Sequence, residues 1–187
     1  MKMQFHEFLT ETFKNFLDGD HAEKEKYVDQ VWDMLQAAYK KVGGIHGNGF
    51  GSKEDMIRMI PFWKLAVRGD KVTALAMYKM KDGRKRVAIA TDATASGKKD
   101  LMDILKNDLT SGRSYGEVSG PSLAFISKNF GESELKKYFV PVDVVKRVLW
   151  DDEIRAVDNF MYERKIGGEW HEKVMIGNAS LSKYYKK

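Results

Sequence analysis

Apolar side chains return every three or four residues between positions 27 and 42, which is the spacing of one face of a helix. The residues on this face are Val28, Val31, Trp32, Leu35, Tyr39 and Val42. The pattern predicts a helix that Gly43-Gly44 ends. Ser52 and Asp55 then have the spacing of a capping box, so we expect a second, short helix that stops at Pro61.

Three strands follow, separated by two short turns. Residues 63–67 alternate in polarity, whereas residues 72–78 and 86–91 are largely apolar. Gly69-Asp70 and Asp82-Gly83 have the composition of two-residue hairpin turns. The pattern predicts an antiparallel meander. Because its second and third strands are apolar on both faces, we expect helices on both sides of the sheet.

A loop of residues 92–99 leads from the third strand into a helix over residues 101–109, whose apolar residues share one face. A further strand is expected at residues 113–119, and Pro121 opens a helix that ends at Gly131. The order strand, helix, strand implies a right-handed crossover, which places the new strand parallel to the third one.

The last third of the chain predicts a helix after Pro141 and a hairpin around Gly167-Gly168. The fold class is therefore mixed α/β (α+β), a mixed sheet with an antiparallel meander, a loop suited to phosphate and helices on both faces. We expect one domain over residues 1–187. Residues 1–20 either pack as a helix or form an appendage that binds another subunit, so a homodimer is one expected state.

Charged residues of the predicted hairpin offer a candidate site. With a two-residue turn, Arg164 falls opposite His171 and Glu163 falls opposite Glu172, so two carboxylates would share one face. Such a pair would share a proton and bind a cationic amine, unless a bulge shifts the register. The alternative is that these charges discourage edge-to-edge aggregation, which is the commoner role of charges on an edge strand. Trp170 of the same hairpin is a candidate contact residue.

Composition narrows the functional classes. The chain has no cysteine, which excludes thiol catalysis and thiolate metal sites and fits a reducing compartment. Its four histidines lack the spacing of a zinc motif, so no metal is expected. The amino terminus lacks a long apolar run, and no segment has the length of a membrane span, so we expect a cytoplasmic protein with no membrane partner. A formal net charge of +5 favours anionic ligands in general.

The clearest candidate binding site is the junction Ser96-Gly97-Lys98. A strand that ends in a short glycine-bearing loop and opens a helix offers unpaired backbone N–H groups and the positive end of the helix dipole. Gly97 would let a phosphate approach the backbone, Ser96 and Thr94 could donate hydroxyl bonds, and Lys98 with Lys99 would add charge. The alternative is an ordinary helix start, in which Ser96 or Thr94 is only the N-cap.

The order of elements resembles the GNAT superfamily of acyl-CoA-dependent N-acyltransferases: two helices, a three-stranded meander, a glycine-bearing loop, a helix, a strand and a further helix. In that family the loop after the fourth strand wraps the pyrophosphate of CoA. The resemblance implies acetyl-CoA or another acyl-CoA as co-substrate and an amine-bearing small molecule or protein as acceptor. The implied cofactor-binding residues are Ile89, Ala90, Thr91, Thr94, Ala95, Ser96, Gly97, Lys98 and Lys99.

For turnover we expect a general base near the thioester. Glu117 is the candidate base, because it would lie at a strand end, and Tyr115 on the same face is the candidate acid. His46 and Phe50, in a glycine-rich segment, could wall the substrate pocket together with His171. A solvated or ion-paired role for Glu117 is the alternative.

A non-catalytic function stays open as a second hypothesis. Lys98-Lys99 stand where the family pattern has a second small residue, and the helix after residue 120 has no tyrosine of the kind that often acts as general acid in the family. Such a GNAT-like protein would use its basic surface and its aromatic hairpin to bind a protein or a nucleic acid.

Overall fold

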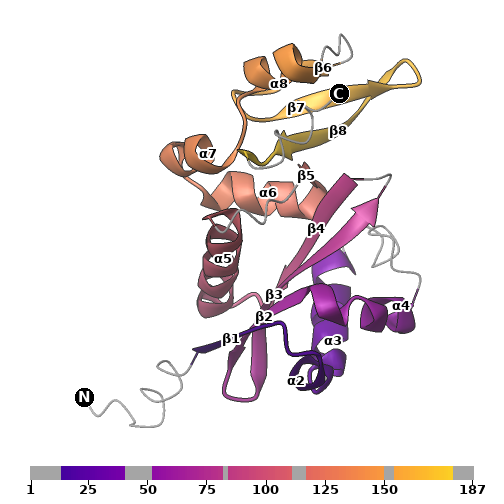
Figure 1. Cartoon of the computed structure of the whole chain (residues 1–187), viewed down its shortest axis with the longest axis vertical. Coiled ribbons are helices and arrows are strands. Elements are labelled where there is room, and N and C mark those ends of the chain that lie inside the picture. The colour runs from indigo at the N-terminus through magenta and orange to yellow at the C-terminus, as the bar shows by residue number, and fades with distance from the viewer. Residues whose placement is uncertain (1–13, 41–51, 82–83, 111–116, 150–153, 179–187) are drawn as a thin grey trace. The chain divides into compact units, whose positions relative to one another are not determined.

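The computed structural model describes five segments of the chain, residues 14–40, 52–81, 84–110, 117–149 and 154–178 (Figure 1). By their internal contacts the residues divide into two compact units. The amino-terminal unit comprises residues 1–79 and 88–105, and the carboxyl-terminal unit comprises residues 80–87 and 106–187. Both units combine helices with strands, so the mixed α/β class is confirmed.

The amino-terminal unit is built on the predicted meander and one additional strand. Its strands follow the order β1-β2-β3-β4, and their bounds are β1 Lys14–Asp18, β2 Trp63–Arg68, β3 Lys71–Lys81 and β4 Arg84–Thr91. β1 pairs antiparallel with β2, and β2 pairs antiparallel with β3. Gly69 adopts a positive φ in the turn between β2 and β3, whereas the expected turn at residues 82–83 lies outside the described residues.

The helices of this unit are α2 His21–Glu25, α3 Val28–Tyr39, α4 Lys53–Arg58 and the start of α5 Ala95–Thr110, with a 3₁₀ turn over Ile60–Phe62. Side chains cap the starts of α2, α4 and α5, whereas α3 begins without a side-chain cap. The Ser52 hydroxyl accepts a hydrogen bond from the Asp55 amide at 3.2 Å, which confirms the predicted start of α4. Asp20 caps α2 in the same way, accepting from the Glu23 amide. The glycines expected to end α3 lie outside the described residues.

Both faces of the meander are covered, as predicted. Leu65 and Leu75, which are register partners, belong to a buried cluster with residues of α3. Ala66 and Ala74 point to the opposite face by strand alternation and are also fully buried. Figure 1 shows α3 and α5 on the two sides of these strands.

The carboxyl-terminal unit begins with the last two residues of β3 and the first four of β4. The bounds of its other strands are β5 Glu117–Ser119, β6 Ile154–Ala156, β7 Tyr162–Ile166 and β8 Glu169–Ile176. Arg86 of β4 pairs with Glu117 of β5 in parallel, as the crossover predicted, and the strand order is β4-β5-β8-β7-β6. Where β5 ends, the Ser122 hydroxyl donates to the Val87 carbonyl at 2.8 Å, which satisfies the edge of β4.

Three helices complete this unit: α6 Gly120–Asn129, α7 Glu132–Tyr138 and α8 Val142–Leu149. The helix predicted after Pro141 is thus confirmed as α8. It packs on the β6-β7-β8 sheet through a buried cluster of Val140, Val142, Val145, Ile154, Tyr162, Val174 and Ile176. Lys106, in the last turns of α5, binds Glu134 of α7 at 2.8 Å, and this hydrogen bond lowers the pKa of Glu134.

The hairpin has a bulge, so one predicted pairing is wrong. Ile166 pairs with Glu169 across Gly167-Gly168, both of which adopt positive φ as the turn requires. The register then shifts by one residue, so that Glu163 lies opposite Lys173 and not Glu172. Because the bulge separates the two carboxylates, the paired-acid site is replaced by a row of opposite charges.

Residues 14–18 are a strand, which the helical interpretation of the amino terminus did not anticipate. Leu17 is a register partner of Leu65 and joins the buried cluster of α3. Pairing with β2 therefore overrides the local apolar spacing of residues 5–17. Within the described residues no helix is both long and apolar enough to cross a membrane.

Candidate functional site

The junction between β4 and α5 is held by a chain of local hydrogen bonds. Asp92 Oδ1 accepts from the amide of Thr94 at 3.1 Å and from its hydroxyl at 2.5 Å. The same hydroxyl oxygen accepts from the Gly97 amide at 2.9 Å. Of the two caps that the sequence allows, Ser96 and Thr94, the structure uses Thr94. Ala93, which lies between Asp92 and Thr94, has a φ of 65°, a left-handed conformation that the turn at Asp92 imposes on it.

Asp92 is a largely buried anion beside the helix start. Its side chain is 10% exposed, and Oδ2 lies 3.1 Å from the ammonium of Lys71. Burial acts to raise the pKa of Asp92, but hydrogen bonds from Thr94 and Lys71 outweigh it, so the net pKa lies below 3.8. The carboxylate is therefore ionised at neutral pH, and it balances part of the positive potential of α5.

Gly97 has a role in packing, whereas from the sequence we expected it to let a phosphate approach the backbone. It is buried against β3 and the Asp92 side chain, not presented to solvent. A Cβ at this position would lie 2.1 Å from Asp92 Oδ1 and 2.7 Å from the Thr73 carbonyl oxygen. Only glycine lets α5 approach the sheet this closely.

Hydrogen-bond donors and cations remain available on the outer side of the junction. The amides of Ala95 and Ser96 lie in the first turn of α5, where backbone N–H groups have no carbonyl partner within the helix. Lys98 and Lys99 are exposed, and neither forms an ion pair with a carboxylate of the residues that the structure describes. Since α5 is 16 residues long, its dipole adds to their positive potential. This surface can bind an anion.

The strand that leads into the junction is largely buried. Ile89 and Ala90 are 5% and 4% exposed, and the Ile89 carbonyl accepts a hydrogen bond from the Tyr39 hydroxyl at 3.2 Å. Thr91 is half-buried, and its hydroxyl accepts from the Ala93 amide at 3.1 Å. A ligand that pairs with this segment through the Ile89 carbonyl must therefore share that oxygen with the Tyr39 hydroxyl or displace it.

The other predicted site residues are not brought to the junction by any described contact. Glu117 is the first residue of β5, a strand inside the sheet, and its register partners are Arg86 of β4 and Ile176 of β8. Tyr115 lies outside the described residues, as do the two predicted pocket residues, His46 and Phe50. His171 is exposed on β8 of the carboxyl-terminal unit. Among the described residues, no group of three or more candidate ligands could hold a metal ion.

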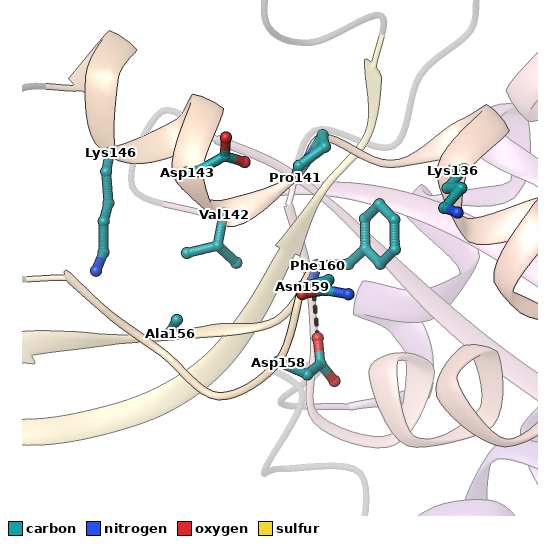
Figure 2. A pocket seen from close by; sticks show the side chains of 9 residues that line it. All are labelled: Lys136, Pro141, Val142, Asp143, Lys146, Ala156, Asp158, Asn159 and Phe160. Atoms are coloured by element: carbon teal, nitrogen blue, oxygen red, sulfur yellow. Dashed lines mark hydrogen bonds between the residues drawn. The ribbon is translucent and has the colours of Figure 1, made fainter.

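The carboxyl-terminal unit contains a pocket of about 570 Å³ that sequence reasoning did not anticipate (Figure 2). Figure 2 shows Lys136 and Lys146 on opposite sides of it. Asp158 accepts from the amides of Phe160 and Met161 and so forms the turn that closes one wall. The lining residues are Lys136, Pro141, Val142, Asp143, Lys146, Ala156, Asp158, Asn159 and Phe160. Two lysines and two aspartates balance, so the pocket favours no sign of ligand charge.

In the sequence analysis, Asp92 has no role within the loop, and Lys71 is not connected with the junction. A local signal exists for Asp92, because an aspartate two residues before a threonine at a strand end is typical of an Asx turn. Lys71 gives no such signal, since it begins a different strand. Comparisons of the chain with protein-family models, with curated proteins and with solved structures find no match. The functional argument therefore rests on the chain's own residues.

Proposed function

We propose that this protein is an acyl-CoA-dependent N-acyltransferase of the GNAT type, which transfers an acetyl or related acyl group to an amine. The observation that carries the proposal is the place of the junction in the fold. With β1 included, β4 is the fourth strand, and the loop after it opens α5, which leads to a strand parallel to β4. The family resemblance implies that the loop at this place holds the CoA pyrophosphate.

The residues proposed to hold pyrophosphate lie on the outer side of α5. The amides of Ala95 and Ser96 would donate to phosphate oxygens, and Lys98 and Lys99 would neutralise their charge. The segment Ile89–Thr91 would receive the pantetheine arm. Gly97 and Asp92 act behind this surface: they fix the height of the helix start and contact no ligand.

The chemical step is assigned to Glu117 as general base, with Tyr115 as general acid. A carboxylate near the thioester would take a proton from the acceptor amine, so that the neutral amine attacks the acyl carbon. The acyl group then joins the nitrogen, and CoA leaves as its thiol. An amine-bearing small molecule or an amine-bearing protein fits this chemistry.

Binding is tested by thermal unfolding with and without acetyl-CoA. A ligand at about a hundred times its dissociation constant stabilises the folded state by about 2.7 kcal/mol. The variant Lys98→Glu with Lys99→Glu should lose this shift. Acidic residues suit a helix start, so the variant should keep the parent midpoint without ligand. Lys26→Glu with Lys40→Glu is the matched control, because it changes the same charge on exposed residues elsewhere in the amino-terminal unit.

Turnover is tested by the release of CoA thiol. The protein has no cysteine, so a thiol reagent reports the released CoA without a protein background. A panel of amines, including a polyamine and a lysine-bearing peptide, should contain at least one acceptor. Glu117→Gln should lose the release and keep the thermal shift. No shift with acetyl-CoA or with longer acyl-CoAs would end the proposal.

A further inference from the structure

One face of the β6-β7-β8 sheet carries a small group of basic and aromatic side chains. Ile154, Tyr162 and Val174 point toward α8 and belong to the buried cluster of this unit. The residues that alternate with them point to the other face of the sheet. In register they are Arg155 opposite Glu163, Glu163 opposite Lys173, and Lys165 opposite Trp170. We call these five residues, Arg155, Glu163, Lys165, Trp170 and Lys173, the basic face.

Trp170 is the aromatic centre of the basic face. It is 36% exposed, and two cations lie over its ring. The guanidinium carbon of Arg155 lies 4.6 Å from the ring centroid, and the ammonium of Lys165 lies 5.8 Å from it. Cation–π attraction holds the indole against these side chains. The ring thus lies beside both cations at the end of the hairpin and keeps part of its surface exposed.

The charge of the basic face is positive. Three cations stand against one carboxylate, Glu163, which is engaged by Arg155 at 2.5 Å between Nε and Oε2. Lys165 and Lys173 form no ion pair in the part of the chain that the structure describes, although Lys173 is the register partner of Glu163. A bound polyanion would therefore gain two ammonium groups that no ion pair engages, that of Lys165 beside the indole and that of Lys173 farther along the same face.

We propose that the basic face binds single-stranded nucleic acid, with a base stacked on Trp170 or on the Arg155 guanidinium and phosphates at Lys165 and Lys173. Aromatic side chains bordered by cations bind single strands because each unpaired base offers a π face and each phosphate a charge. A duplex keeps its bases stacked and so cannot use the indole. An acidic peptide would satisfy the lysines but leave the indole without a stacking partner. This site is independent of the proposed acyltransferase function.

The test measures the fluorescence anisotropy of labelled oligothymidylate and oligouridylate of about 20 nucleotides, longer than the site of one small domain. Trp170→Ala should weaken binding roughly 5- to 150-fold, the range for losing one stacked base, whereas Trp170→Phe should keep most of the affinity. Phe62→Ala is the matched control, because Phe62 is an exposed aromatic residue on the other unit.

The lysines are tested through salt dependence. Each phosphate contact with a single strand adds about 0.7 to the slope of log affinity against log salt, so Lys165→Glu with Lys173→Glu should reduce the slope by about 1.4. Lys26→Glu with Lys40→Glu should leave it unchanged. Binding that a duplex or polyglutamate matches in strength, or that survives Trp170→Ala, would overturn the proposal, and so would the absence of binding at low salt.

Discussion

Asp100 of α5 binds Arg68 of β2 with both carboxylate oxygens, at 2.8 and 2.9 Å between the paired atoms. The same carboxylate accepts a hydrogen bond from the hydroxyl of Thr73 on β3 at 2.7 Å. Asp100 is fully buried, and Arg68 is mostly buried beside it. A bidentate pair of this kind stabilises the fold and also fixes the orientation of its two partners, so the contact sets how α5 lies on the meander.

We predict that Asp100→Ala lowers the free energy of unfolding by about 3 kcal/mol, because it leaves the Arg68 guanidinium partly buried without its anion. Urea denaturation measures the loss. Arg58→Ala is the control: it breaks an ion pair with Asp55 whose partners are both exposed, and it should cost about 1 kcal/mol or less. If both variants lost a similarly small free energy of unfolding, the buried pair would not stabilise the fold as predicted.

Gly97→Ser should destabilise the amino-terminal unit by about 1–3 kcal/mol, the cost of forcing atoms into a packed interior. The new Cβ would meet the Thr73 carbonyl oxygen, a backbone atom that cannot rotate away. Gly131→Ser is the matched control, because a Cβ there meets nothing within 4 Å and serine suits the helix N-cap. Thermal unfolding of both variants decides whether Gly97 is required for packing or only for a ligand.

The sequence predicts most of the fold because the patterns are local. The meander, α3, α4 and the crossover to β5 each follow from apolar spacing, turn residues or caps within a few positions. β1 could not be predicted in this way, since only its pairing with β2 buries Leu17. The bulge in the hairpin could be named only as an alternative, because Glu163 becomes the register partner of Lys173 only after one residue is left unpaired.

The candidate site was predicted as a place but not in its details. Thr94 was foreseen as one of two possible caps, because its type and position, like those of Ser96, suit an N-cap. The role of Gly97 depends on Thr73, which lies on another strand, and no local pattern reveals that contact. The ion pair of Asp92 with Lys71, which begins another strand, could not be predicted for the same reason. Contacts between distant segments decide these roles, and one sequence does not contain them.

Asp92 should make the amino-terminal unit sensitive to acid. Because its pKa in the folded state lies below 3.8, its contribution to stability is present above that pH and is lost as the pH falls through the folded value. Asp92→Asn should be less stable than the parent by about 1–2 kcal/mol at pH 7, and the gap between the two proteins should narrow as the pH falls below 3.8. Urea midpoints over this range measure the difference. A constant gap at all pH values would assign the loss to altered packing instead.

Lys24 should have the opposite sign of pH dependence. Its side chain has no exposed surface, and its ammonium donates to the Ile60 carbonyl at 3.3 Å. Burial lowers the pKa of Lys24 below its usual 10.5, although Asp18 and Asp20 act to raise it. In the folded state the ammonium is thus disfavoured, and the cost is present at neutral pH. The cost disappears as the pH rises from the folded pKa to 10.5, where the unfolded chain also loses the proton.

Lys24→Met should therefore raise the free energy of unfolding at pH 7 by up to about 2 kcal/mol, because it keeps the apolar stem and removes the buried charge. Thermal unfolding at pH 7 and pH 10 measures the effect, and the advantage of the variant should shrink at the higher pH. Lys26→Met, on an exposed neighbour, should change stability by less than about 0.5 kcal/mol at both values. A destabilised Lys24→Met would mean that the hydrogen bond to Ile60 and the attraction of Asp18 and Asp20 outweigh the cost of burial.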